Sequence, residues 1–325
     1  MNVFLAGGSG AIGRQLIPAL VSRGHEVVAT TTTSTKAPAL EAAGSRPVVL
    51  DLLDGDRVAR AVADAEPDVV VHQASALSGP LSLRRFDASF AQTNRLRTDG
   101  LDNLLAAAIA AGSSRFVAQS FTGWPNERAG GSVKTEADRL DPRPPAAARE
   151  TLAAIRVLEA TVVGCDALEG VVLRYGALYG PGTSLGVGGE LVEMVRRRRF
   201  PLVGDGGGVW SFVHVADAAQ ATVAAIEGRG NGVYNVVDDE PAPVAEWLPY
   251  LAETLNAKPP RRIPVWLARL VIGEQGVAMM TEMRGSSNAK AKRELSWEPR
   301  YTSWRVGFVS LLENEVLERE RRRAA

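Results

Sequence analysis

The sequence predicts an α/β fold in which a doubly wound parallel sheet is followed by a smaller, mainly helical C-terminal region. Short apolar runs recur along the first half of the chain, with helical patterns between them. Two of these runs, residues 69–71 and 171–173, are continuous rather than alternating with polar residues, which is typical of strands buried on both faces of a parallel sheet. Glycine and proline become frequent after Arg174, and helical patterns predominate after Pro241, which indicates a region of different architecture.

The same patterns predict the order of the elements. Strands are predicted at residues 2–6, 27–30, 47–50, 68–72, 115–119 and 170–174. Helices are predicted at residues 11–23 and 101–111, the second of which is rich in alanine and leucine and stops at Gly112. A further strand, helix and strand are predicted at residues 210–215, 216–227 and 233–237. This alternation of strands and helices favours a parallel sheet.

Composition excludes several classes of function. Lysine plus arginine equals aspartate plus glutamate, at 37 each, so the zero net charge gives no electrostatic footprint for nucleic acid or for an anionic membrane. The single cysteine, Cys165, cannot form an intrachain disulfide, and the three histidines lack the spacing of metal ligands, so no metal is expected. No stretch approaches the ~20 apolar residues of a membrane span, and the N-terminus has no basic lead, so a cytoplasmic location is expected.

The first predicted strand runs into a glycine-rich turn, and a predicted helix follows it. Gly7, Gly10 and Gly13 form the pattern G-x-x-G-x-x-G. Glycine permits the tight turn, the close approach of a pyrophosphate to the backbone and the close packing of helix on strand. The start of the helix, at Ala11 and Ile12, offers free N–H groups and partial positive charge. The turn therefore predicts a dinucleotide-binding site.

The segment after the second predicted strand indicates which dinucleotide binds. NAD binding usually requires an acidic residue about 20 residues further on, to bind the ribose hydroxyls. Here no acid occurs between that strand and Glu41. Hydroxyls, including that of Thr32, and the Lys36 ammonium are available instead and could hold a 2′-phosphate. NADP(H) is therefore expected in preference to NAD(H); the alternative is that Lys36 is merely a solvated residue of the next helix.

Several segments, in a fixed order, resemble the extended short-chain dehydrogenases/reductases of the NAD(P)-dependent epimerase/dehydratase family, over nearly the whole chain. The glycine turn matches, residues 174–182 resemble the segment that passes the nicotinamide, and residues 211–217 resemble the family's Val-His-Val-x-Asp segment. The resemblance implies a Rossmann domain at residues 1–175, with residues 210–237 returning to it, and a substrate-binding region at residues 176–209 and 238–325. It also implies further cofactor-binding residues, namely Asp51, Leu52, Gln73, Ala74, Ser75, Asn94, Gln119, Tyr175, Gly176 and Leu178.

The sequence departs from the family at its catalytic motif, Tyr-x-x-x-Lys, because no tyrosine here has a lysine four residues later. In the family the tyrosine exchanges the proton, and the lysine lowers the pKa of that tyrosine. Alignment on Glu159 puts Thr151 in the tyrosine position and Ile155 in the lysine position, and neither side chain can do this chemistry. The chain therefore resembles an atypical member of the family.

Three other side chains are candidates for catalysis. The loop after the fifth strand offers the hydroxyls of Ser120 and Thr122, which could polarise a substrate carbonyl or could equally be structural turn residues. Arg149, at the start of the helix that should carry the motif, could bind an anion or an oxyanion, although a permanent cation is a poor proton donor. The alternative for Arg149 is a solvated position on the helix.

The function expected from these features is that of an NAD(P)H-dependent oxidoreductase that reduces the carbonyl group of a small organic substrate and uses a non-standard proton donor. An epimerase or dehydratase acting on a sugar nucleotide is one alternative, but those reactions also use the missing tyrosine. A non-catalytic NADP-binding sensor is the other, and the retained segment at residues 174–182 counts against it. The expected partner is the small-molecule substrate, and a homodimer through two helices would fit the resemblance.

Overall fold

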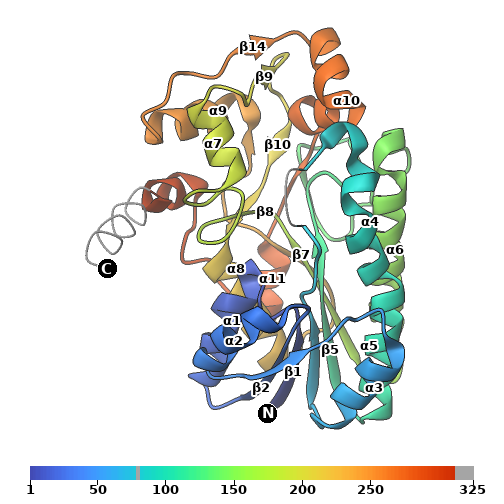
Figure 1. Ribbon diagram of the computed structural model, residues 1–325. Helices are drawn as coiled ribbons and strands as arrows, with labels where there is room; N and C mark the ends of the chain where they lie inside the picture. Colours follow the sequence, from blue (N-terminus) through green and yellow to red (C-terminus); the bar gives the residue numbers. More distant parts are fainter. Residues whose placement is uncertain (78–80, 312–325) are drawn as a thin grey trace, which may run out of the picture.

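The computed structural model describes residues 1–77 and 81–311, and its centre is a seven-stranded sheet with helices on both faces (Figure 1). The strand order is β12-β7-β5-β4-β1-β2-β3, and every neighbouring pair is parallel. The strands are β1 Asn2–Ala6, β2 Glu26–Thr31, β3 Arg46–Val49, β4 Val69–His72, β5 Arg115–Phe121, β7 Glu169–Tyr175 and β12 Gly232–Val236. The predicted doubly wound α/β fold is confirmed. The order of the strands reverses between β1 and β4, which is where such sheets bind ligands at their carboxyl edge.

Two helical layers cover the sheet because successive residues of a strand point to opposite faces. In β1, Leu5 packs toward α1 and α8, whereas Phe4 packs toward α3 and α5. The first layer contains α1 Ala11–Val21, α2 Ala37–Ala42, α8 Val215–Glu227 and α11 Ala289–Leu295. The second contains α3 Gly55–Ala63, α4 Phe86–Arg97, α5 Asp99–Ala110 and α6 Arg149–Val163.

The C-terminal region has its own aromatic core, formed mainly by Trp210, Phe212, Trp247, Trp304 and Phe308. Its helices are α7 Glu190–Arg196, α9 Val244–Thr254 and α10 Val265–Thr281, together with a helical stretch at residues 304–311. Four two-stranded sheets accompany them: β8 Ala177–Tyr179 with β11 Phe212–His214, β9 Leu202–Val203 with β14 Arg262–Ile263, β10 Val209–Trp210 with β13 Ala242–Pro243, and β6 Val133–Lys134 with β15 Gly285–Ser286. Single 3-10 turns occur at η1 Ser34–Lys36, η2 Leu83–Arg85 and η3 Ala146–Ala148.

The strand predicted at residues 210–215 is confirmed only in part. The segment forms two short strands, β10 and β11, and neither joins the seven-stranded sheet. The physical reason is that the Ser211 carbonyl accepts from Ala177 N at 2.9 Å, so the backbone is drawn to β8 instead of a main-sheet neighbour. Residues 312–325 of the predicted substrate-binding region lie outside the described residues.

Helix α10 connects the C-terminal region to the segment that precedes α4. The helix is interrupted at Gly273, whose φ of 73° lies in the left-handed region that favours glycine. A Cβ at this position would lie 3.0 Å from Arg84 Cα, so glycine also allows the close approach of η2. Arg84 Nη1 donates to the Leu270 carbonyl at 2.9 Å across the same contact.

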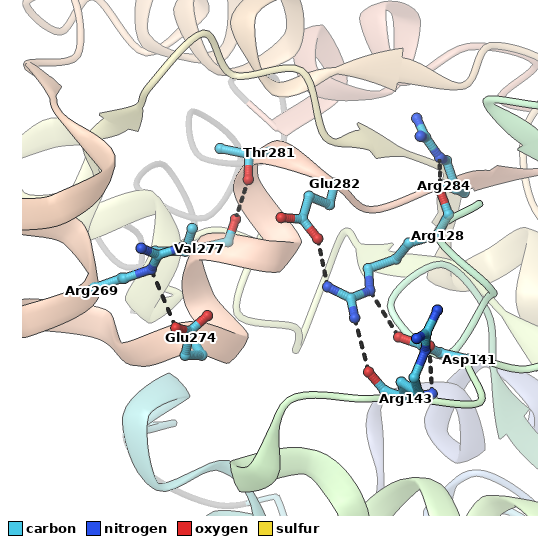
Figure 2. A network of polar contacts seen from close by, with 9 residues as sticks. All are labelled: Arg128, Asp141, Arg143, Arg269, Glu274, Val277, Thr281, Glu282 and Arg284. Carbon is cyan, nitrogen blue, oxygen red and sulfur yellow. Dashed lines mark hydrogen bonds and ion pairs between the residues drawn. The ribbon is translucent and has the colours of Figure 1, made fainter. Parts of the chain in front are cut away.

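A polar network around Arg128 makes a second connection, between the loop after β5 and the end of α10 (Figure 2). Arg128 Nε donates to Asp141 at 2.8 Å, and Nη2 donates to the Arg143 carbonyl at 2.9 Å. Nη1 reaches the Glu282 carboxylate, and Arg284 Nε donates to the Arg128 carbonyl at 2.8 Å. Glu282 and Arg284 therefore hold the loop that follows β5 against the C-terminal region, while Asp141 and Arg143 bind Arg128 within the loop itself.

Two further features concern the described part of the chain only. None of its helices combines the length and the apolar character that a membrane crossing requires. Within the same residues, no group of three or more His, Cys, Asp or Glu side chains is placed to hold a metal ion.

Candidate functional site

The glycine turn between β1 and α1 forms a cradle at the carboxyl edge of the sheet. Gly7 has a φ of 93°, and a Cβ on it would lie 2.7 Å from the backbone of Ala74, so only glycine fits beside the end of β4. A Cβ on Gly13 would lie 2.7 Å from the Gly7 carbonyl oxygen, which keeps α1 close to the turn. Gly10 is different, because among the described residues the only atom within 4 Å of its Cβ position, apart from neighbours in the chain, is the Gly7 oxygen at 3.3 Å. The turn is thus packed closely against the rest of the protein at Gly7 and Gly13, and it has space beside Gly10.

The space beside Gly10 fits an anionic group. Gly10 is the N-cap residue of α1, and no side chain caps the helix there. The first N–H groups of the helix, at Ala11 and Ile12, therefore point toward the open side with the positive end of the helix dipole. This is the arrangement that binds phosphate at helix N-termini.

The end of β2 supports this turn and leaves polar side chains at the surface. Thr30 Oγ1 accepts from Gly7 N at 3.1 Å, and Thr31 Oγ1 lies 3.3 Å from Ser9 Oγ. Thr32 and Lys36 are exposed on the segment that follows. Two of the predicted hydroxyls therefore hold the glycine turn, while Thr32 and Lys36 remain accessible.

The residues after β3 are divided between surface and core. Asp51 is exposed, and its carboxylate accepts from Leu53 N at 3.0 Å. Leu52 is buried among the residues of α3 and α5, and its carbonyl accepts from Asn103 Nδ2 at 2.8 Å. Asp51 is thus available to a ligand through its side chain, and Leu52 only through its backbone.

A buried chain of hydrogen bonds lies beneath the end of β4. Gln73 Nε2 donates to the Tyr175 hydroxyl at 2.8 Å, and this hydroxyl lies 2.7 Å from Thr222 Oγ1. Burial raises the pKa of Tyr175 to about 12, so this tyrosine is a poor replacement for the family's proton donor. Burial likewise lowers the pKa of His72 to about 4, so its ring is neutral near pH 7. Ala74 and Ser75, in contrast, are at least partly exposed.

Ser120 points into the protein rather than into open space. Its hydroxyl donates to Glu159 at 2.7 Å, and Glu159 also accepts two bonds from Arg174, at 2.7 Å and 2.6 Å. All three side chains are buried. The hydroxyl is therefore a partner of a buried ion pair between α6 and β7.

Thr122 is engaged in a separate network. Its hydroxyl lies 2.6 Å from Ser286 Oγ and 3.2 Å from Asn126 Oδ1. The side chain is buried, and its partners belong to the C-terminal region and to the loop after β5. Arg149 is exposed at the first position of α6. The three predicted catalytic side chains are thus placed in three different surroundings, and their catalytic role stays a prediction.

Thr151, which stands at the position predicted for the family's tyrosine, is hydrogen-bonded to the carboxylate of Asp87. The sequence did not reveal this contact. Thr151 Oγ1 donates to Asp87 Oδ1 at 2.6 Å and accepts from Asn94 Nδ2 at 3.1 Å. Asp87 also accepts from the backbone N–H groups of Glu150 and Thr151, at 3.1 Å and 2.9 Å, and so caps α6 from α4. Ile155, at the predicted lysine position, is fully buried. No sequence signal points to Asp87, because it is remote in the chain from the helix that it caps.

The remaining predicted cofactor residues lie at the ends of β5 and β7. Gln119 is half-buried near the end of β5. Gly176 follows β7 directly, and a Cβ on it would lie 2.6 Å from the Ser211 carbonyl oxygen. Leu178 is half-buried in β8. These three positions share the carboxyl edge with the glycine turn, because neighbouring strands of the sheet are parallel.

Aromatic side chains gather near the start of α6. The rings of Phe86 and Phe90 stack with centroids 4.5 Å apart, and Trp124 meets Phe86 edge-on at 4.9 Å. Ala148 and Met279 belong to the same cluster. Trp124 also packs against the aromatic core of the C-terminal region, so it lies between the two clusters.

The segment after β7 is anchored to the C-terminal region by buried polar side chains. Tyr179 is fully buried, its hydroxyl has no hydrogen-bond partner among the described residues, and burial raises its pKa. His214 packs its ring 5.2 Å from Tyr179 and 4.0 Å from Tyr301. Asp217 accepts from the backbone N–H groups of Arg300 and Tyr301, at 3.0 Å and 2.9 Å. Residues 211–217 therefore fasten the C-terminal chain at Arg300 and Tyr301.

Asp238, in the same cluster, makes stability depend on pH. Burial raises its pKa to about 8, whereas the unfolded value is near 4, so the folded protein favours the protonated form. The stabilising contribution is complete below about pH 4 and is lost as the pH rises through about 8. We expect Asp238→Asn to raise the unfolding temperature at about pH 8 by roughly 2–4 °C and to flatten its pH profile.

The matched control for this prediction is Asp166→Asn, which changes an exposed carboxylate. Thermal unfolding at a series of pH values provides the measurement. If the unfolding temperatures of both variants change with pH as steeply as that of the wild-type protein, Asp238 is not the titrating group.

Comparison with known proteins identifies the family. A family model described as the NAD dependent epimerase/dehydratase family matches residues 3–236. The chain belongs to this family. It is therefore an NAD(P)-dependent oxidoreductase of the epimerase/dehydratase family, and the predicted recognition is confirmed. The family assignment agrees with the open glycine turn at the start of α1.

Curated relatives in this family include several reductases. A 3-diazoavenalumate denitrifying reductase from a Streptomyces species is 43% identical over 310 residues, which cover 95% of this chain and 99% of that protein. A 2-alkyl-3-oxoalkanoate reductase from Stenotrophomonas maltophilia is 31% identical and covers 79% of this chain and 76% of its own length. A 4-hydroxy-2-methyl-3-oxo-4-farnesyl-3,4-dihydroquinoline-1-oxide ketoreductase from Stigmatella aurantiaca is 31% identical over 79% of this chain and 74% of its own length.

Solved structures of the epimerase/dehydratase fold superpose over nearly the whole chain. The UDP-glucose 4-epimerase of Thermotoga maritima has a TM-score of 0.77 at 22% identity and covers 98% of this chain and 100% of its own. The human epimerase family protein SDR39U1, solved with NADPH, has a TM-score of 0.75 at 20% identity and covers 97% of this chain and 100% of its own. At these identities the likeness establishes the fold alone.

Proposed function

We propose that this protein is an NADPH-dependent reductase that transfers hydride to a small organic acceptor which needs no proton from a tyrosine. The observation that carries the proposal is that the chain has a complete glycine cradle, whereas its helix α6 lacks the family's catalytic tyrosine and lysine. Thr151 and Ile155 stand at the positions that the resemblance assigns to the tyrosine and the lysine, and both are fully buried. The protein keeps what is needed to hold the cofactor and lacks the usual proton donor.

The residues around the glycine turn fit a bound NADP(H). The open side of Gly10 and the N–H groups of Ala11 and Ile12 would hold the pyrophosphate. The exposed Thr32 and Lys36 would hold the 2′-phosphate, which favours NADP(H) over NAD(H). The other contacts would come from the adenine side at Asp51 and Leu52, the ribose side at Gln73, Ala74, Ser75 and Asn94, and the nicotinamide side at Gln119, Tyr175, Gly176 and Leu178.

The missing tyrosine matters differently for different acceptors. When bound, the reduced cofactor supplies a hydride. Hydride addition to a carbonyl gives an alkoxide that must be protonated, and a positioned acid contributes about 10²–10⁴-fold to such a step. Reduction of a diazonium carbon forms a C–H bond, breaks the C–N bond and releases dinitrogen, and the charges balance without any proton. An acceptor of the second kind can therefore do without the tyrosine.

A diazo compound is accordingly the first candidate substrate, because the relative with 43% identity is named as a denitrifying reductase of such a compound. A carbonyl compound is the second candidate, favoured by two ketone-reducing relatives at 31% identity. For the carbonyl, the expected roles remain polarisation of the oxygen by Ser120 or Thr122 and binding of an anion by Arg149. An epimerase, a dehydratase or a non-catalytic sensor fits less well, because the first two need the tyrosine and the third needs no hydride acceptor.

The test measures cofactor binding first and hydride transfer second. We expect NADPH to bind more tightly than NADH, and Lys36→Met to remove most of that preference, whereas Lys258→Met at another exposed lysine leaves it unchanged. NADPH deuterated at the transferable position is then incubated with the protein and either an arenediazonium salt or an aryl ketone. We expect release of dinitrogen and deuterium at the carbon that carried the diazo group.

Three results would change the proposal. Deuterium transfer to the ketone alone would favour the carbonyl candidate. Equal affinity for NADH and NADPH would contradict the assignment of Thr32 and Lys36. Binding of neither cofactor would contradict the reductase itself. The predicted homodimer is tested separately, by the mass of the protein in solution.

A further inference from the structure

Arg97, the last residue of α4, is a buried cation that none of the preceding roles uses. Its side chain is only 5% exposed, and its Nη1 has no hydrogen-bond partner among the described residues. The guanidinium carbon lies 5.8 Å from the ring centroid of Phe90. A buried cation with a free N–H group is costly unless a ligand or a counter-charge compensates it.

The neighbouring charges do not balance Arg97. The carboxylate near it is Glu159, but Glu159 already accepts two bonds from Arg174 and one from Ser120. The nearby His72 is neutral, because burial lowers its pKa to about 4. Burial also lowers the pKa of Arg97 to about 10, which still leaves it charged near neutral pH. One positive charge therefore remains in excess in this cluster.

The side chain of Arg97 extends toward the carboxyl edge of the sheet. Side chains on a helix lean toward its N-terminus, and Phe90 lies about two turns closer to that end of α4. Phe90 stacks on Phe86, which contacts Trp124 in the loop after β5. The charge of Arg97 also acts on His72, the last residue of β4. The guanidinium thus lies between α4, α6 and the end of β4, next to the predicted ribose segment.

The same interface contains the position from which the family's lysine would project. Ile155 is buried on α6, and the bond between Asn94 and Thr151 shows that this part of α6 faces α4. A cationic side chain on α4 can therefore reach the same region as a lysine side chain on α6 would. Ile155 provides no charge that would repel it.

We propose that Arg97 replaces the missing lysine as the cation of the cofactor site and donates through Nη1 to a hydroxyl of the nicotinamide ribose. This assignment rests on the proposed reductase function and deepens it. A fixed positive charge at this place disfavours the oxidised nicotinamide, which is itself a cation, relative to the reduced one. Arg97 would thereby hold the cofactor and also make the site prefer the reduced cofactor to the oxidised one.

The test compares Arg97→Met and Arg97→Lys with Arg95→Met, a control on the same helix in which an exposed arginine is removed. The measurements are the dissociation constants for NADPH and for NADP⁺ and the unfolding temperature without ligand. We expect Arg97→Met to weaken NADPH binding by about tenfold or more, as for loss of a hydrogen bond from a charged donor. The ratio of the NADP⁺ constant to the NADPH constant should also fall, and Arg97→Lys should restore part of both effects.

The unfolding temperature separates this role from a purely structural one. Removal of an uncompensated buried cation should leave the ligand-free protein as stable as before or more stable. Loss of folded structure, or a lower unfolding temperature with unchanged cofactor constants, would mean that Arg97 serves only as a partner of Glu159 and would overturn the proposal. Failure of the wild-type protein to bind NADPH would instead contradict the reductase assignment.

Discussion

Replacement of Gly10 by alanine should strongly weaken NADPH binding while leaving the unfolding temperature of the protein nearly unchanged. The backbone at Gly10 has a φ of −73°, which alanine adopts without strain. Among the described residues its Cβ would meet only the Gly7 carbonyl oxygen, at 3.3 Å, a tight contact that a small shift of the turn relieves. The methyl group would stand where the pyrophosphate must approach the N–H groups of α1. We expect a loss of affinity of roughly 100-fold, measured by titration calorimetry.

Gly7→Ala provides the comparison for this prediction. Alanine at Gly7 would be strained by the positive φ and would meet the Ala74 backbone at 2.7 Å, so it should lower both stability and NADPH affinity. Only Gly10→Ala is expected to separate the two properties. Normal NADPH binding by Gly10→Ala would show that the cofactor does not lie over this turn.

Glu159→Gln should be among the most destabilising single changes in the chain, at about 3–5 kcal/mol of unfolding free energy. The carboxylate is buried and holds Arg174 through two short hydrogen bonds. Its neutral replacement would leave Arg174 and Arg97 as buried cations without a counter-charge. Urea denaturation provides the measurement, because its midpoint reports stability directly when the slope is unchanged.

Two controls define the cause of this effect. Glu150→Gln changes an exposed glutamate on the same helix and should alter stability by less than about 0.5 kcal/mol. Ser120→Ala removes one hydrogen bond to Glu159 and should cost about 1–2 kcal/mol. If Glu159→Gln is no more destabilising than Ser120→Ala, the carboxylate charge does not hold this cluster together.

Much of the nucleotide-binding half could be predicted because its signals are local. Continuous runs such as residues 69–71 report burial on both faces, and the glycine spacing reports a turn before a helix. The strand predicted at residues 210–215 is broken into two, and its apolar residues are divided between two cores. Trp210 and Phe212 lie in the aromatic core of the C-terminal region, whereas Val213 and Val215 pack with the residues of the main sheet. Apolar character alone does not distinguish these two environments.

The catalytic side of the site was less accessible to sequence reasoning. Ser120 and Thr122 flank the position at which the resemblance places the family's catalytic serine. Their burial and their partners, Glu159 and Ser286, depend on segments remote in the chain. Asp87 showed no pattern of its own, since its role arises only when α4 packs beside the start of α6.

The sequence by itself determined the parallel sheet, the glycine cradle, the polar and non-acidic loop after β2 and the absence of a Tyr-x-x-x-Lys motif. Each of these depends on residue type at short spacing, and the chain specifies them before it folds. Only the tertiary structure decided that Asp87 caps α6, that Ser120 binds Glu159 and that Arg97 is buried with an excess of charge. These features depend on desolvation and on contacts between helices far apart in the chain, which no local pattern encodes.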